Sequence, residues 1–185
     1  HTVKAVYGGD SNFKSDSNSV VQTVNQTTPT VVVTSSLNPS TFEQSVTFKA
    51  KVDNSSHTPT GSVTFYDGAS SLGGAPLVRD SAQLSTAQRT AGNHTIKAVY
   101  GGDSDFKSDS NSVVQTVNQA TPTVVVTSSL NPSTFEQNVT FKAKVDNSSH
   151  TPTGSVTFYD GASSLGSASL VGDSAQLSTA NLTAG

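Results

Sequence analysis

The chain contains the same sequence twice, at a spacing of 93 residues and without insertions or deletions. Of the 92 aligned residue pairs, 83 are identical. A repeat restricts the fold more than any other feature, because both copies must form the same structural unit and bury the same residues. We therefore expect tandem domains of about 92 residues, a size that buries a hydrophobic core without disulfides or metals.

The repeat also predicts the domain limits. Residues 26–118 are expected to form one complete domain, because residues 1–25 recur as 94–118 and residues 26–92 recur as 119–185. Residues 1–25 are then the last two strands of a preceding repeat, and 119–185 the first strands of a following one. Strands like 1–25 of the next unit would complete 119–185, so that neighbouring identical repeats or subunits join head to tail.

The polar and apolar residues alternate in the manner of β-strands. Over residues 45–52, Val46, Phe48, Ala50 and Val52 fall on one face and the polar residues fall on the other, as in a half-buried strand. Further short strands are expected between Gly, Pro, Asn and Asp turns, at 30–34, 61–66, 72–78, 81–86, 95–100 and 112–117. No window shows the helical period of about 3.6 residues, so the sequence predicts an all-β antiparallel sandwich.

The inward positions of these alternations define a predicted core. We expect it to comprise Val32, Val46, Phe48, Ala50, Val63, Phe65, Leu84, Ile96, Ala98 and Tyr100. Phe42 and Phe106 are expected to anchor loops to this core.

Several segments together resemble a known family. They are TPTVVVTSSLNPSTFEQ, TPTGSVTFYDGASSLG and HTIKAVYGGDS, and they are similar to the repeats of bacterial Ig-like domains, group 3. The resemblance covers the whole chain and implies an immunoglobulin-like β-sandwich, found in tandem arrays on large secreted or surface-attached proteins. It implies no catalytic residues.

One pair of residues departs from the family pattern. Gln88-Arg89 stands where the second copy has Asn181-Leu182. Leu182 fits the apolar position that the family has before Thr-Ala-Gly. Because Arg89 is charged, the sequence does not predict how this position packs, and Arg89 is expected to be exposed.

Composition excludes several classes of partner. With no cysteine, the chain can form neither disulfides nor thiolate metal sites. A net charge of −3 offers no clustered cations to a nucleic acid. No apolar run approaches the length of about 18 residues that suggests a membrane span, so no membrane insertion is expected within this segment.

The candidate sites are weak. His57 and His94 lie in no nucleophile motif and are expected to be exposed in a loop and at a strand end, so no enzyme is predicted. Asp103, Asp105 and Asp109 are spaced like oxygen ligands of Ca²⁺, but the bidentate Glu of a calcium loop is missing. We expect a solvated loop and no cofactor, with Ca²⁺ as the open alternative.

We expect a structural repeat of an extracellular or cell-surface stalk, fibre or adhesin, acting as a spacer or filament-building unit. The alternative is an adhesive or carbohydrate-binding module that contacts a ligand through its loops. The chain has no Trp, and few aromatic residues remain for sugar stacking. An accessory domain of an enzyme is a third possibility.

Overall fold

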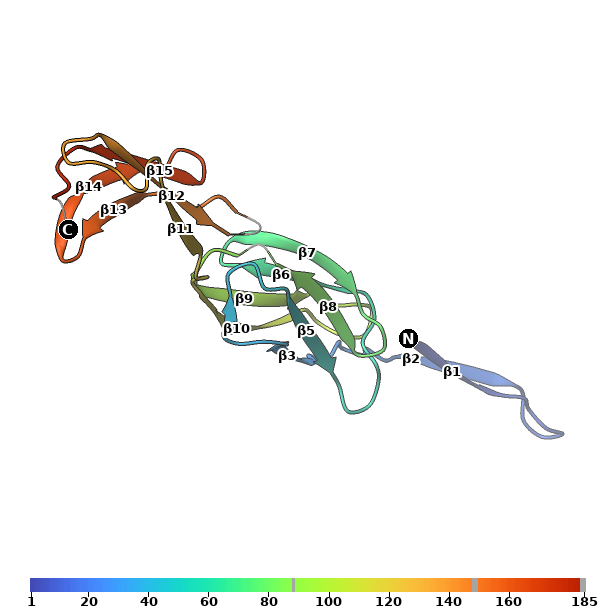
Figure 1. The fold of residues 1–185 in the computed structure, drawn as a ribbon. Coiled ribbons are helices and arrows are strands. Elements are labelled where there is room, and N and C mark those ends of the chain that lie inside the picture. The colour runs from blue at the N-terminus through green and yellow to red at the C-terminus, as the bar shows by residue number, and fades with distance from the viewer. Residues whose placement is uncertain (88, 148–149, 184–185) are drawn as a thin grey trace. The chain divides into compact units, whose positions relative to one another are not determined.

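The computed structural model describes residues 1–87, 89–147 and 150–183 of the chain. These residues form strands β1 to β15 and no helix (Figure 1). The chain divides into two compact units, residues 1–118 and 119–185. Gln88 and the last two residues of the predicted 119–185 segment lie outside the described residues.

The first unit contains a sandwich of two sheets. One sheet has the strand order β4-β10-β9-β6-β7 and the other has the order β3-β5-β8. The strands are β3 (Thr30–Ser35), β4 (Ser40–Thr41), β5 (Val46–Asp53), β6 (Ser62–Asp67), β7 (Ser70–Pro76), β8 (Ser81–Thr86), β9 (Gly92–Tyr100) and β10 (Asp109–Asn118). The predicted all-β immunoglobulin-like sandwich is confirmed.

Strand β4 lies where the sequence predicts only a turn. Residues 40–41 pair in parallel with the end of β10, whereas β3 pairs antiparallel with β5. The first segment of the domain therefore crosses from one sheet to the other between Ser35 and Ser40. A strand of two residues is too short to show an alternation in the sequence. Strand β4 is recognised only by its pairing with β10.

Glycine is required in the turn that follows β9. Gly102 has a φ of 87°, in the left-handed region, and a Cβ there would lie 2.9 Å from the carbonyl oxygen of Phe106. Only glycine accepts both conditions without strain. The turn brings Phe106 into the core, as predicted for a loop anchor.

The core of residues 26–118 confirms most of the predicted positions. Val46, Phe48, Ala50, Val63, Phe65, Ile96, Ala98 and Tyr100 are all buried. Leu84 is only partly buried and packs against this cluster.

The prediction for Val32 is wrong, because Val31 and Val33 point inward and Val32 is exposed. Residues directly opposite one another in an antiparallel pair share a face of the sheet. Val31 pairs with Val52, and Val33 pairs with Ala50. A run of three valines carries no polar residue to show which face is inward, so its partner strand decides.

Residues 1–25 form a separate hairpin. Strands β1 (Thr2–Tyr7) and β2 (Asp16–Val21) pair with each other, and all of their side chains are exposed. The hairpin has the register of β9 and β10: Thr2 pairs with Val21 as Thr95 pairs with Val114.

The second unit repeats part of the sandwich. The strands β11 (Thr123–Ser128), β12 (Val139–Asp146) and β15 (Ser174–Thr179) form a sheet like β3-β5-β8. Strands β13 (Ser155–Asp160) and β14 (Ser163–Ser169) form a hairpin like β6-β7. Among the described residues of this unit, no strands correspond to β9 and β10, so β13 is an open edge. In the part of the chain that the structure describes, no helix could cross a membrane.

Candidate functional site

The acidic loop before β10 is organised around the Asp103 carboxylate. Its Oδ1 accepts hydrogen bonds from the amides of Asp105 (2.9 Å) and Phe106 (2.8 Å). Its Oδ2 accepts from the amide and the hydroxyl of Thr60, both at 2.8 Å. These bonds, above all the one from the Thr60 amide, hold the pKa of Asp103 well below its usual range. The carboxylate thus joins the loop before β6 to the loop before β10.

The three calcium candidates do not converge. Asp109 lies at the start of β10, where its Oδ2 accepts a hydrogen bond of 3.2 Å from the amide of Val31. Asp105 is exposed on the loop. Within residues 1–87, 89–147 and 150–183, no group of three or more His, Cys, Asp or Glu side chains could hold a metal ion. Asp103 and Asp109 therefore act here as acceptors for backbone amides.

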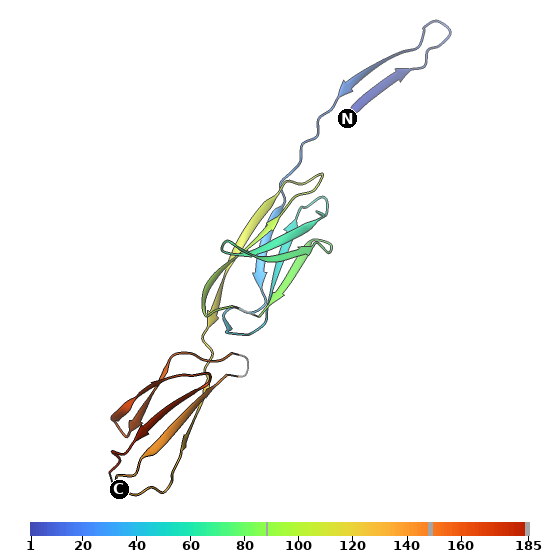
Figure 2. The same cartoon turned by 90° about the horizontal axis from the view of Figure 1, so that it is seen from above.

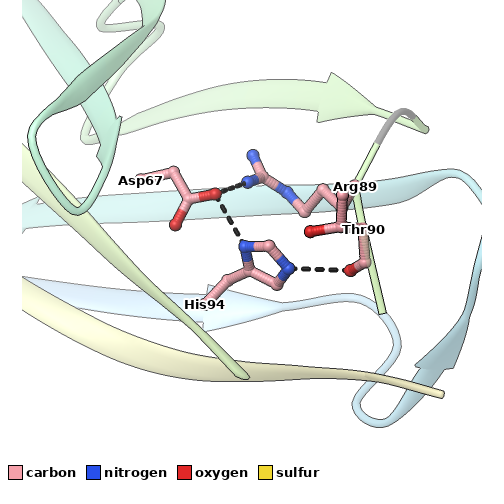
Figure 3. A network of polar contacts seen from close by, with 4 residues as sticks. All are labelled: Asp67, Arg89, Thr90 and His94. Atoms are coloured by element: carbon pink, nitrogen blue, oxygen red, sulfur yellow. Dashed lines mark hydrogen bonds and ion pairs between the residues drawn. The ribbon is translucent and has the colours of Figure 1, made fainter. Parts of the chain in front are cut away.

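A second polar cluster joins β6, the β8–β9 loop and β9 (Figure 3). The Asp67 carboxylate at the end of β6 accepts a hydrogen bond from Nη1 of Arg89. The same oxygen lies 2.8 Å from Nδ1 of His94, and Nε2 of His94 lies 2.8 Å from the carbonyl oxygen of Thr90. Both ring nitrogens face oxygen acceptors, and only the imidazolium form can donate to both at once.

This cluster has two of the three parts of a hydrolytic triad. The third part would be a hydroxyl or thiol on the free side of the His94 ring. The atom at that place is the Thr90 carbonyl oxygen, which is an acceptor and cannot act as a nucleophile. The arrangement therefore fastens the loop before β9 to the end of β6, which is a structural role.

Two expectations about this cluster are wrong. Arg89 is buried, with 7% of its surface exposed, and its guanidinium lies 5.4 Å from the centre of the Phe48 ring. His94 is also partly buried, whereas His57 is exposed as expected. The sequence did contain a signal: Arg89 replaces an apolar residue of the second copy, and Asp67 supplies the charge that allows it to point inward.

Gln115 is a buried polar residue that the sequence analysis missed. It is fully buried in β10. Its amide donates to the Leu37 carbonyl (2.9 Å) and the Ser40 hydroxyl (3.1 Å), and it accepts from the Ser35 hydroxyl (2.6 Å). It therefore ties β10 to the segment that crosses between the sheets. Gln115 alternates with the inward Val113 and Val117, but glutamine is normally a surface residue, so the pattern was overlooked.

Several apolar side chains of residues 119–185 are exposed, although their counterparts in residues 26–118 are buried. Val124 and Val126 are 55% and 58% exposed, and their counterparts Val31 and Val33 are 2% and 8% exposed. A groove of about 290 Å³ runs between β11 and β13, lined by Val124, Val126, Phe141, Val156, Phe158 and Leu165. In residues 26–118 the counterparts of these side chains belong to a core cluster that also contains Ile96, Ala98 and Tyr100 of β9.

The comparison with protein families supports the fold. The profile of the bacterial Ig-like domain, group 3, matches residues 33–118 and 126–185. Among solved structures, fibronectin(III)-like modules of Clostridium thermocellum CbhA match with 16% identity, a TM-score of 0.39, and coverage of 83% of this chain and 80% of that one. The human OSCAR ligand-binding domain matches with 13% identity, a TM-score of 0.36, and coverage of 84% of both chains. No curated protein matches the chain.

Proposed function

Because the chain belongs to the bacterial Ig-like domain family, group 3, we propose that it is a structural repeat of an extracellular stalk, fibre or adhesin. Its role is that of a spacer: each domain adds a fixed length between an anchor and a distal part of the protein. Domains of this family are generally non-catalytic and commonly exposed at the cell surface, which supports both the spacer role and the absence of enzymatic activity.

The path of the chain through residues 26–118 carries this proposal. The chain enters beside the loop before β10, where Gln26 Nε2 donates to the Asp103 carbonyl (2.7 Å) and the Thr27 amide donates to the Asp105 carbonyl (3.1 Å). It leaves after Asn118, at the far end of β10 (Figure 2). Since β10 has ten residues, entry and exit are separated by about 30 Å.

The connection to the next repeat fits the same role. Only residues 119–122 lie between β10 and β11, and Pro122 is among them. A short connection with proline bends less than a flexible linker of glycine and serine. Entry and exit at opposite ends, with a short connection between repeats, make length proportional to the number of copies.

The test is the length of arrays with increasing copy number. Chains of two, four and six covalently joined repeats should lengthen by about 35–40 Å per repeat, from β10 and the connection together, in small-angle scattering or electron microscopy. A matched array with Pro122 and its equivalents changed to glycine should be more compact. Arrays that collapse without lengthening would contradict the spacer role.

Direct ligand binding through the loops is the other outcome to measure. Tyr100 is buried and Tyr66 half-buried in the complete sandwich, so neither offers a sugar-stacking platform there. A glycan array probed with residues 26–118 should show no selective binding. A selective signal that survives competition controls would replace the spacer role with an adhesive or carbohydrate-binding one.

A further inference from the structure

We propose that His94 fastens the β8–β9 loop to β6 only in its protonated form, and that Arg89 lowers the pH at which this contact is released. All the groups concerned lie in residues 26–118, where the two sheets of the sandwich enclose one core. The inference goes beyond the spacer role and does not depend on it.

His94 lies at the start of the inward row of side chains on β9. It alternates with Ile96 and Ala98, which are fully buried, and it is directly opposite Gln115 of β10. The side chain of His94 is 14% exposed, and that of Asp67 is 23% exposed. Because this site is largely removed from water, a charge there depends on its partners more than a surface charge does.

The His94 ring makes both of its contacts as a donor only when it carries two protons (Figure 3). Nδ1 lies 2.8 Å from Oδ2 of Asp67, and Nε2 lies 2.8 Å from the carbonyl oxygen of Thr90. A neutral imidazole has a single N–H. The charged carboxylate is the stronger acceptor and keeps that N–H. The lone pair of Nε2 then faces the Thr90 carbonyl oxygen, so deprotonation breaks the contact with the loop.

Arg89 opposes the proton on His94. Its Nη1 donates to the same carboxylate oxygen, Oδ2 of Asp67. The two cations therefore lie within the range of about 4–6 Å in which like charges disfavour each other, and one carboxylate serves both. Arginine stays charged across the pH range in which histidine titrates. Arg89 therefore weakens the hold on the His94 proton, and the loop is released at a lower pH than it would be without this arginine.

The other elements around the imidazole ring bring charges that are less directly placed. Gln115, opposite the ring on β10, is uncharged. Lys97 is exposed on the outer face of β9, and Glu43 follows β4, which pairs with the end of β10. Asp67 bonds the ring, and Arg89 bonds the same oxygen of Asp67. The balance between the two charge states of the ring is therefore set chiefly by Asp67, which favours the charged form, and by Arg89, which disfavours it.

The first test follows the His94 ring by NMR in the full chain, with the ring identified through sequential backbone assignment. Arg89→Leu should raise the pH midpoint of its titration by about one unit, since it removes the like charge, and Leu182 is the natural counterpart. Arg79→Gly is the matched control. It removes the same charge from an exposed turn, Gly172 is its counterpart, and the φ of 64° at this position suits glycine.

Arg79→Gly should leave the midpoint of the His94 titration unchanged. A shift in Arg89→Leu no larger than the shift in Arg79→Gly overturns the proposed effect of Arg89. A His94 ring that keeps one charge state between about pH 5 and 8, the range in which histidine ordinarily titrates, overturns the proposal as a whole.

The second test follows the acceptor in the loop. In the unchanged chain the NMR signal of the Thr90 carbonyl carbon should titrate with the midpoint of the His94 ring, because this carbonyl gains and loses one hydrogen bond with the proton. In Arg89→Leu the two midpoints should move together, and in His94→Gln the carbonyl signal should not respond to pH. If the loop is fastened in every charge state of the ring, the Thr90 signal stays constant while the ring titrates, and that result overturns the proposal. The unchanged chain and Arg89→Leu decide this even if His94→Gln does not fold.

Discussion

Val31 and Val124 occupy the same position in two copies of one sequence, yet one is buried and the other is more than half exposed. The same contrast separates Phe106, with 4% of its surface exposed, from its counterpart Phe13, with 67% exposed. The residues and their strands are the same. What differs is whether β9 and β10 lie against β3 and β6. The burial of these side chains therefore depends on contacts with strands from other parts of the repeat, and their own strand does not decide it.

Other positions are equally buried in both copies of the repeat. Ala50 and Ala143 are both fully buried, and Ala82 and Ala175 are each 1% exposed. These alanines lie in the sheets β3-β5-β8 and β11-β12-β15, which have the same pairing. Strand pairing within one sheet therefore forms without the missing strands, whereas the interior between the two sheets does not close.

The largest effect is expected from a core aromatic. Phe48→Ala should lower the free energy of unfolding of residues 26–118 by about 3–5 kcal/mol, because the side chain is fully buried. Phe141→Ala in residues 119–185 should cost about 1–2 kcal/mol, because Phe141 is only partly buried. Urea titrations of the two segments measure both. Equal losses of unfolding free energy would show that Phe48 and Phe141 are equally well packed in their two segments.

Gln115 gives the next largest contrast. Gln115→Ala should destabilise residues 26–118 by about 3 kcal/mol, since it removes partners from Ser35, Leu37 and Ser40. Gln22→Ala, in the exposed hairpin, should leave the monomer unchanged. Thermal unfolding followed by circular dichroism gives both values. A loss below about 0.5 kcal/mol for Gln115→Ala would mean that water replaces these bonds readily.

The Asp103 carboxylate should make the stability of residues 26–118 depend on pH. Its pKa is lowered in the folded state, so its contribution to stability is fully present above the unfolded pKa of about 3.9 and is lost as the pH falls toward the folded pKa. Residues 26–118 should therefore weaken below about pH 4. Asp103→Asn should cost about 1–2 kcal/mol at pH 7 and flatten this acid dependence. Asp10→Asn, in the hairpin, should do neither.

Replacing Arg89 should change the stability of residues 26–118 less than its burial suggests. Its Nε and Nη2 atoms are buried without a hydrogen-bond partner among the described residues, so the ion pair with Asp67 is only partly satisfied. Replacing a buried ion pair by an apolar side chain is often nearly neutral, and Leu182 is the natural replacement. Arg89→Leu should change the stability of residues 26–118 by less than about 1 kcal/mol. A loss above 3 kcal/mol would identify the pair as essential.

The smallest expected effect is that of calcium. Asp103 already accepts hydrogen bonds from Asp105, Phe106 and Thr60, so a cation would have to displace them. EDTA should leave the melting temperature unchanged within about 1 °C. A fall of more than about 5 °C, of order 1 kcal/mol for a domain of this size, would restore the calcium alternative for Asp103, Asp105 and Asp109.

The sequence predicted the strands better than the sites. Seven strands of residues 26–118 follow from alternation and turn residues, because period and turn chemistry are local. Strand β4 and the inward face of the three valines do not follow, because each depends on a partner strand distant in sequence. Gln115 fits the local alternation of β10, but glutamine is normally exposed. The substitution of Arg89 for the leucine of the second copy marks the position of the polar cluster, but its partners Asp67 and His94 lie on other strands and do not follow from it.

By itself, the sequence determined the repeat, the immunoglobulin-like sandwich and the match between residues 1–25 and 94–118, since identity and periodicity can be read without coordinates. Only the tertiary structure decided that Arg89 and Gln115 point inward. Burial is set by contacts between segments far apart in the chain, such as Ser35 with Gln115, 80 residues away. Local patterns show which side chains can be buried, and the neighbouring sheet decides which ones are.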